Sequence, residues 1–171
     1  LMNAVAAAGV SAANFSATVD SVWLDLSKGL GCPVGAVLSG SREFIHEAWR
    51  WKHRIGGAMR QAGVVAAAGS WALKHHVDRL AEDHENAQLL AKRISALDGV
   101  TLVNEKVETN MVFFDVSQTP LSAAEISARL RGKGIWIGAF GEQKMRAVTH
   151  LDVRREDIIE TSDALADILV H

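Results

Sequence analysis

One stretch of nine residues, 27–35, constrains what this chain can fold into more than any other. Its sequence is S-K-G-L-G-C-P-V-G, so three glycines and one proline fall within it. Glycine admits left-handed backbone and proline fixes φ, so such a stretch forms a tight, specially shaped turn. The apolar run before it (21–26, S-V-W-L-D-L) and the run after it (36–38) favour two short strands. The chain therefore places a glycine-rich turn at the end of a strand.

In the rest of the chain, the pattern of apolar and polar residues changes near residue 98. Before it, helical patterns predominate, and Ser41 is a plausible N-cap. After it, the order is strand, strand, helix, strand, strand, helix, with a capping box from Ser122 to Glu125. We therefore predict two domains, 1–98 and 99–171, the second a compact α+β module. The expected helices are 1–8, 42–53, 59–78, 79–97, 122–131 and 155–169, and the expected later strands are 100–103, 111–116, 135–137 and 145–150.

Composition excludes several classes of protein. Apolar residues make up 49% and charged residues 22% of the 171 residues, which is typical of a globular chain and not of a disordered one. The single cysteine excludes an internal disulfide and is compatible with a reducing cytoplasm. The longest apolar run, 63–69, is too short to span a bilayer. Only 41–60 is basic, so we expect neither a membrane nor a nucleic-acid partner, although this stretch could suit a small anionic ligand.

Lys28 is the strongest candidate for chemistry. It follows an apolar strand, which would place it rigidly, and the glycines around it let another group approach the backbone closely. A lysine amine partly withdrawn from water gives up its proton more readily, which suits Schiff-base formation with a carbonyl. The structural alternative is a solvated lysine in a loop.

Two arginines could bind anions. Arg60 follows Gly56-Gly57 and is expected to open a helix, where a phosphate would fit. Arg146 lies in a predicted strand and could bind a carboxylate with both arms of its guanidinium. A surface arginine and an edge-strand charge are the alternatives. Zinc is not expected, because the sequence has one cysteine and no His-x-x-x-His pair, and a small buried side chain is the favoured interpretation of Cys32.

The residues resemble a known family, the low-specificity L-threonine aldolases, which are pyridoxal-phosphate enzymes of fold type I, the aspartate-aminotransferase-like fold. The similarity covers nearly the whole chain. It is carried by 21–45 (S-V-W-L-D-L-S-K-G-L-G-C-P-V-G-A-V-L-S-G-S-R-E-F-I), by 50–69 with its G-G-A-M-R-Q block, and by L-A-E-D-H-E-N-A, E-T-N-M-V-F-F-D and R-A-V-T-H-L-D-V. The block S-K-G-L-G-x-P-x-G followed by G-G-x-M-R-Q is highly specific.

The resemblance implies a role for each candidate residue. Lys28 would form the internal aldimine with pyridoxal 5'-phosphate. Arg60 would help hold the cofactor phosphate, in the family across a subunit interface, and Arg146 would bind the substrate carboxylate. Some members carry a lysine where this chain has His53, which leaves that position open as a phosphate contact.

The resemblance also implies a α/β fold that is only partly present: the C-terminal part of the cofactor-binding large domain (1–98) and the small α+β domain (99–171). The family's stacking histidine, its Gly-Thr phosphate loop and the aspartate of its H-x-D-G-A-R block are not in this sequence. The implied reaction is retro-aldol Cα–Cβ cleavage of L-threonine or L-allo-threonine to glycine and acetaldehyde, in threonine catabolism and glycine biosynthesis, by a cytoplasmic homodimer or homotetramer. The alternatives are a catalytically incomplete segment with a structural or oligomerisation role, and a related β-eliminating lyase or aminotransferase.

Overall fold

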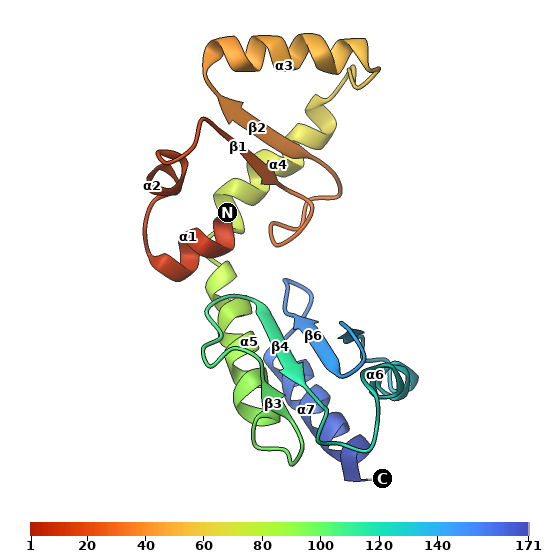
Figure 1. The fold of residues 1–171 in the computed structure, drawn as a ribbon. Coiled ribbons are helices and arrows are strands. Elements are labelled where there is room, and N and C mark those ends of the chain that lie inside the picture. Colours follow the sequence, from red (N-terminus) through yellow and green to blue (C-terminus); the bar gives the residue numbers. More distant parts are fainter. Residues whose placement is uncertain (171) are drawn as a thin grey trace. The chain divides into compact units, whose positions relative to one another are not determined.

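The computed structural model describes residues 1–170, which form two compact units (Figure 1). The first is Leu1–Leu80 and the second begins at Ala81. This division differs from the predicted boundary at 98/99 by one helix, α5 (Leu80–Ile94). The apolar face of α5 belongs to the core of the second unit, which is why the contacts divide the chain before it. The boundary at 98/99 stays a prediction about the domains of the family.

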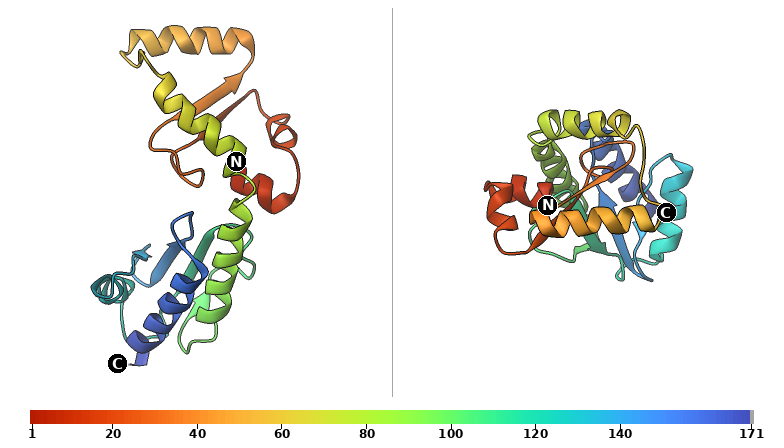
Figure 2. Two further views of the ribbon diagram at one scale, coloured as in Figure 1. Left: turned by 180° about the vertical axis from the view of Figure 1, so that it is seen from behind. Right: turned by 90° about the horizontal axis from the view of Figure 1, so that it is seen from above.

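The first unit contains a two-stranded antiparallel sheet and four helices (Figure 2). The strands pair over their whole length, from Ser21 opposite Gly40 to Asp25 opposite Ala36. The predicted strand before the glycine turn and the predicted strand after it are both confirmed. The short helix α2 was not expected from the sequence. The elements are α1 (Met2–Ala8), α2 (Ala12–Ser16), β1 (Ser21–Asp25), β2 (Ala36–Gly40), α3 (Arg42–Arg54) and α4 (Gly63–His75).

A small apolar cluster holds the first unit together. Its buried members are Leu26, Leu30, Cys32 and Ala72, so the buried environment expected for the cysteine is confirmed. Gly69 of α4 brings this helix against the end of β1, because a Cβ at that position would lie 2.9 Å from Leu26 Cδ1. The end of β1 and the buried residues of the glycine turn thus pack against α4.

The second unit is an α+β module. A four-stranded antiparallel sheet has the order β3-β4-β6-β5, and α5 and α7 pack on one of its faces (Figure 2). Buried Val112 and Phe114 of β4 and Met145 of β6 meet Leu90 of α5 and Leu165 of α7 in a single core. The elements after α5 are β3 (Thr101–Leu102), β4 (Met111–Asp115), α6 (Ala123–Gly132), β5 (Gly138–Ala139), β6 (Lys144–Val148) and α7 (Arg155–Val170).

Local sequence patterns predicted some of these helix and strand boundaries correctly and others incorrectly. The hydroxyl of Ser122 accepts a hydrogen bond from the Glu125 amide, and the Glu125 carboxylate accepts one from the Ser122 amide, so the capping box is confirmed. The strand expected at 135–137 is wrong. Pairing with β6 begins only at Gly138, opposite Arg146. Across residues 1–170, none of the helices combines the length and apolarity needed to cross a bilayer.

Burial of His84 on α5 predicts a pH-dependent stability. The side chain is buried, and burial lowers the pKa of His84 below 6.5, although the neighbouring Asp83 carboxylate opposes this. The folded chain therefore keeps His84 neutral where the unfolded chain takes up a proton. Below pH 6.5 the unfolded state binds more protons than the folded state. The free energy of unfolding therefore decreases as the pH is lowered, by at most about 1.4 kcal/mol per pH unit for one group.

Urea denaturation at pH 7.5 and pH 5.5 measures this effect. We expect His84→Gln to lose less stability between the two pH values than the unsubstituted chain. The control is His75→Gln, whose exposed ring lies against Trp71, with centroids 4.0 Å apart. An identical pH dependence in the His84→Gln variant and the unsubstituted chain would exclude His84 as the source.

Candidate functional site

The glycine turn is closed onto the end of β1 by backbone hydrogen bonds. The Leu26 amide donates to the Gly35 carbonyl at 3.0 Å, and the Cys32 amide donates to the Leu26 carbonyl at 3.0 Å. Gly31 and Gly35 have φ values of 69° and 123°, in the region that side chains disfavour. The turn is therefore a closed loop whose glycines are required by its backbone, and Lys28 lies at its beginning.

Lys28 forms an ion pair with Asp25, three residues earlier on β1. The second carboxylate oxygen of Asp25 accepts hydrogen bonds from the Ser27 amide at 2.9 Å and the Ser27 hydroxyl at 2.7 Å. The hydrogen bond from Lys28, followed by those from Ser27, lowers the pKa of Asp25 from 3.8 to about 2. The carboxylate is therefore ionised at any ordinary pH and faces the lysine as a fixed negative charge.

The amine of Lys28 is open to solvent on its other sides. The side chain is 76% exposed, so the partial burial expected from the sequence is wrong for the described chain. Its Nζ atom lies 5.8 Å from the ring centroid of Trp23, within cation–π range. Lys28 lines a cavity of about 300 Å³ together with Trp23, Asp25 and residues of α1. The lysine is thus held by its neighbours on the strand and is accessible to a reagent.

A histidine ties the turn to α4. The His76 Nδ1 atom donates a hydrogen bond to the Leu30 carbonyl at 2.7 Å, across 46 residues of sequence. A carbonyl only accepts, so this bond fixes the proton of the neutral ring on Nδ1. His76 directly follows α4, which Gly69 also joins to Leu26. The position of the lysine turn is therefore set by α4 at two points.

Arg60 lies in the turn before α4 and not at the first position of the helix. The helix begins at Gly63, and Gln61 adopts a left-handed backbone with φ of 53°, which ends the turn and separates Arg60 from the helix. The expected helix opening at residue 59 is therefore wrong. Arg60 is exposed, and among residues 1–170 its guanidinium has no hydrogen bond or ion pair. It is a free cation on the same unit as Lys28, although no contact joins the two.

Arg146 lies on the face of the sheet opposite the core of the second unit. It pairs with Phe113 of β4 on one side and Gly138 of β5 on the other. Its guanidinium lies 5.7 Å from the ring centroid of Phe140, and that ring meets Phe113 edge-on at 5.7 Å. The charge is thus presented over an aromatic surface, with the side chain exposed.

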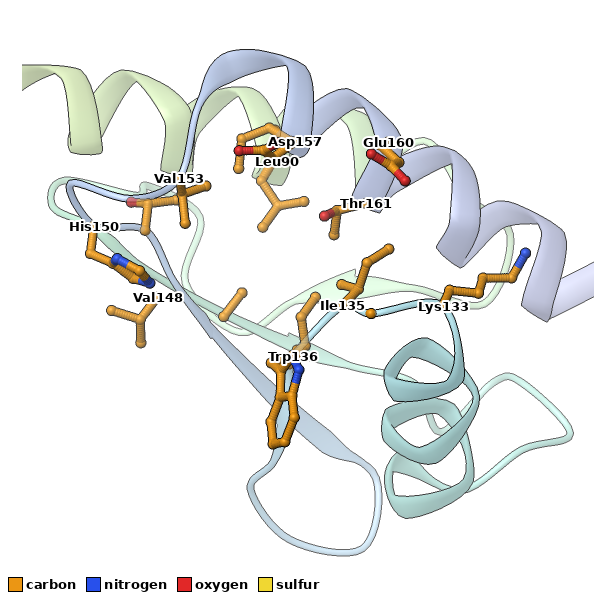
Figure 3. A pocket seen from close by; sticks show the side chains of 15 residues that line it. Leu90, Lys133, Ile135, Trp136, Val148, His150, Val153, Asp157, Glu160 and Thr161 are labelled. Carbon is orange, nitrogen blue, oxygen red and sulfur yellow. The ribbon is translucent and has the colours of Figure 1, made fainter.

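The remaining sequence candidates have structural contacts. His53 donates from Nδ1 to the Trp49 carbonyl at 3.0 Å, one turn earlier on α3. Within the described part of the chain, no group of three or more histidine, cysteine or acidic side chains is arranged to hold a metal ion. A second cavity, of about 340 Å³, lies in the second unit between α7 and the strand ends (Figure 3). Trp136 and His150 line it, but none of the predicted site residues does.

Sequence reasoning missed Asp25 as part of the site. The signal was present, because Asp25 is the only charged residue in the apolar run 21–26 and lies three positions before the lysine. Phe140 was missed as well, because its contact with Arg146 depends on the pairing of β5 with β6. Asp25 and Lys28 are brought together on the first unit, whereas Arg146 belongs to the second.

Comparison with known proteins places this chain among lyases. Residues 1–118 match the family model described as beta-eliminating lyase. The low-specificity L-threonine aldolase of Escherichia coli strain K12 is 40% identical over 162 residues, covering 95% of this chain and 46% of that protein. Low-specificity L-threonine aldolase 1 of Arabidopsis thaliana is 37% identical over 159 residues, covering 92% of this chain and 44% of that protein.

Solved structures agree on the fold. A crystal structure of a protein assigned as an L-allo-threonine aldolase, from Listeria monocytogenes, superposes with a TM-score of 0.79 at 21% identity. It covers 97% of this chain and 49% of that protein. The expected fold class, that of fold type I pyridoxal-phosphate enzymes, is confirmed by such neighbours. The chain spans about half the length of the curated relatives it matches.

Proposed function

This chain belongs to the beta-eliminating lyase family, and on that basis we propose that it supplies the lysine of a pyridoxal 5'-phosphate enzyme that cleaves L-threonine and L-allo-threonine to glycine and acetaldehyde. The observation that carries the proposal is the position of Lys28. A primary amine at the end of β1, beside a cavity and on a closed glycine turn, lies within the stretch that the family model matches. The identity of 40% with an L-threonine aldolase supports the choice of substrate.

The residues present suit this cofactor by type. Pyridoxal phosphate has an aldehyde, which reacts with a primary amine, and a phosphate, which a guanidinium binds well. Lys28 is an accessible amine, and Arg60 is an exposed guanidinium without a protein partner among residues 1–170. We assign Lys28 to covalent attachment of the cofactor and Arg60 to its phosphate.

Each residue then has a distinct task. When bound, the cofactor accepts the electron pair that remains on Cα after the Cα–Cβ bond breaks. Lys28 would hold the cofactor through Nζ. Arg146, on the second unit, would bind the substrate carboxylate with both arms of its guanidinium. The aromatic surface of Phe140 and Phe113 supports this guanidinium.

Substitution of Arg146 tests its role. We expect Arg146→Lys to raise the KM for L-threonine by about 10- to 100-fold, because a single ammonium replaces a two-armed contact with the carboxylate. Steady-state kinetics of the active protein measure it. The matched control is Arg131→Lys, since Arg131 also packs on an aromatic ring, that of Trp136 at 4.7 Å. Equal KM values for the Arg146→Lys and Arg131→Lys variants would remove Arg146 from the substrate site.

Reductive trapping tests the proposal as a whole. The chain is incubated with pyridoxal phosphate, reduced with borohydride and digested, and the modified lysine is mapped by mass spectrometry. We expect the adduct to be dominated by Lys28. Release of glycine and acetaldehyde from L-threonine then identifies the reaction, whereas ammonia and a keto acid would point to a related β-eliminating lyase. Labelling scattered over the lysines of a folded chain would contradict the cofactor role of Lys28.

A second candidate is a structural or oligomerisation segment without activity of its own. The observation in its favour is the apolar surface of the first unit, where Trp23, Trp49 and Trp71 are each more than half exposed. Under this alternative the chain is folded but takes up no cofactor on Lys28. We propose a homodimer or homotetramer for the whole protein, in a reducing cytoplasm, and light scattering measures the assembly.

A further inference from the structure

The contacts of Lys28 point to a role for Asp25. The carboxylate of Asp25 is divided between two partners: one oxygen pairs with the Lys28 ammonium, and the other accepts two hydrogen bonds from Ser27. The Asp25 side chain is 16% exposed, whereas that of Lys28 is 76% exposed. The acid is therefore the fixed partner, anchored to the backbone of the turn, and the flexible lysine is held against it.

We propose that Asp25 is a positioning residue for Lys28: the Asp25 carboxylate holds the side-chain amine at the mouth of the turn until an aldehyde takes it. The cofactor part of this proposal rests on the function proposed above. The ion pair itself is independent of that function, because it is formed by residues of this chain alone.

The chemistry of Asp25 favours holding over proton transfer. Because Lys28 and Ser27 lower the pKa of Asp25 to about 2, the carboxylate is a weak base and does not keep the lysine's proton. The ammonium must lose one proton to water before it reacts. The amine nitrogen then bonds to the aldehyde carbon, and the carbonyl oxygen leaves as water. Asp25 opposes this reaction, because its contact with Nζ must be broken before the amine can attack the aldehyde.

Few other charges surround Lys28. The cavity that it lines is bounded by α1, β1, the glycine turn and Leu80. Among these lining residues, the ionisable side chains are those of Asp25 and Lys28. Trp23 contributes a ring face and not a charge. Removal of the Asp25 charge should therefore change the reactivity of the amine directly.

Acetylation by acetic anhydride measures this reactivity without any cofactor. At a fixed pH near 8, the rate of acetylation of Lys28 is compared with the rates of Lys52 and Lys74 in the same molecule by mass spectrometry. We expect Asp25→Asn to raise the relative rate of Lys28 about two- to fivefold, the range given by the loss of one exposed ion pair. An unchanged rate in a folded Asp25→Asn variant would overturn the proposal.

The chain offers a matched control. Asp115 also ends a strand, β4, and its carboxylate accepts a hydrogen bond from the Ser117 amide at 2.8 Å, two residues later, as Asp25 does from Ser27. The Ser117 side chain, followed by this backbone hydrogen bond, lowers the pKa of Asp115 too. We expect Asp115→Asn to leave the relative rate of Lys28 unchanged. A similar rise in the Asp25→Asn and Asp115→Asn variants would show a general loosening of the chain and would overturn the proposal.

Two further arms keep the result interpretable. If Asp25→Asn does not fold, Ser27→Ala keeps both charges but removes one anchor of the carboxylate, and we expect a smaller rise in the Lys28 rate. Pyridoxal phosphate trapping is then run on the same variants. Faster acetylation with no adduct in any variant would contradict the proposed function and leave the positioning role intact. An adduct on Lys28 together with an unchanged acetylation rate in the Asp25→Asn variant would support the proposed function and contradict the positioning role of Asp25.

Discussion

We expect Lys28→Ala to abolish the pyridoxal adduct that borohydride traps on this chain. The other lysines of the first unit, Lys52 and Lys74, lie on the exposed helices α3 and α4 and do not line the cavity beside the glycine turn. An aldehyde that prefers a positioned amine has no equivalent target once Lys28 is gone. Peptide mapping after reduction measures the loss at each lysine separately.

Lys52→Ala is the control for this result. Like Lys28, Lys52 has its ammonium within cation–π range of a tryptophan, with Nζ 5.2 Å from the ring centroid of Trp49. It lacks the glycine turn and the cavity. We expect the Lys52→Ala variant to keep the adduct on Lys28. An adduct of unchanged amount in the Lys28→Ala variant would refute the assignment of the cofactor lysine.

The second large effect concerns stability. Phe114 is fully buried at the centre of the second unit, where it packs among residues of β6, α6 and α7. Phe114→Ala removes most of a buried aromatic ring and leaves a cavity, which costs about 3–5 kcal/mol. This is a large share of the roughly 5–15 kcal/mol by which ordinary domains are stable. We expect a large fall in the urea midpoint of the second unit, measured by circular dichroism.

The neighbouring residue provides the comparison. Phe113 is the same residue type on the same strand but points to the opposite face, where it is only partly buried against Phe140. We expect Phe113→Ala to cost well under half as much as Phe114→Ala, because less surface is withdrawn from water there. Equal losses of stability in the Phe113→Ala and Phe114→Ala variants would show that burial of the ring does not determine its contribution to stability.

Local patterns predicted several elements of the second unit, although they did not predict that α5 belongs to it. Its strand order along the chain follows from alternating apolar residues, and the start of α6 follows from Ser122 and Glu125, whose side chains satisfy each other's backbone amides. The strand at 135–137 was misplaced for a tertiary reason. Ile137 is buried and Trp136 is 77% exposed, as in a strand, but pairing with β6 begins only at Gly138.

The candidate site was less accessible to sequence reasoning. Lys28 stands out because of the glycines around it, but neither its exposure nor its ion pair with Asp25 was predicted from the sequence. Arg60 was expected to open α4, and the left-handed backbone at Gln61 prevents this. A positive φ at a residue other than glycine has no reliable signal in sequence. The roles of Arg60 and Arg146 stay predictions that the experiments above address.

The two buried clusters differ greatly in size, and this difference determines how large a share of each unit's stability a bound ligand would supply. Four buried apolar residues fasten the lysine turn, against eighteen in the second unit. A molecule that binds only the folded turn adds RT ln(1 + [L]/Kd) to the free energy of unfolding, about 2.7 kcal/mol at a hundredfold excess over Kd. On a core of four residues that increment is a large share of the whole. Under the proposed function, binding of the cofactor to the turn would therefore also stabilise the fold of the first unit.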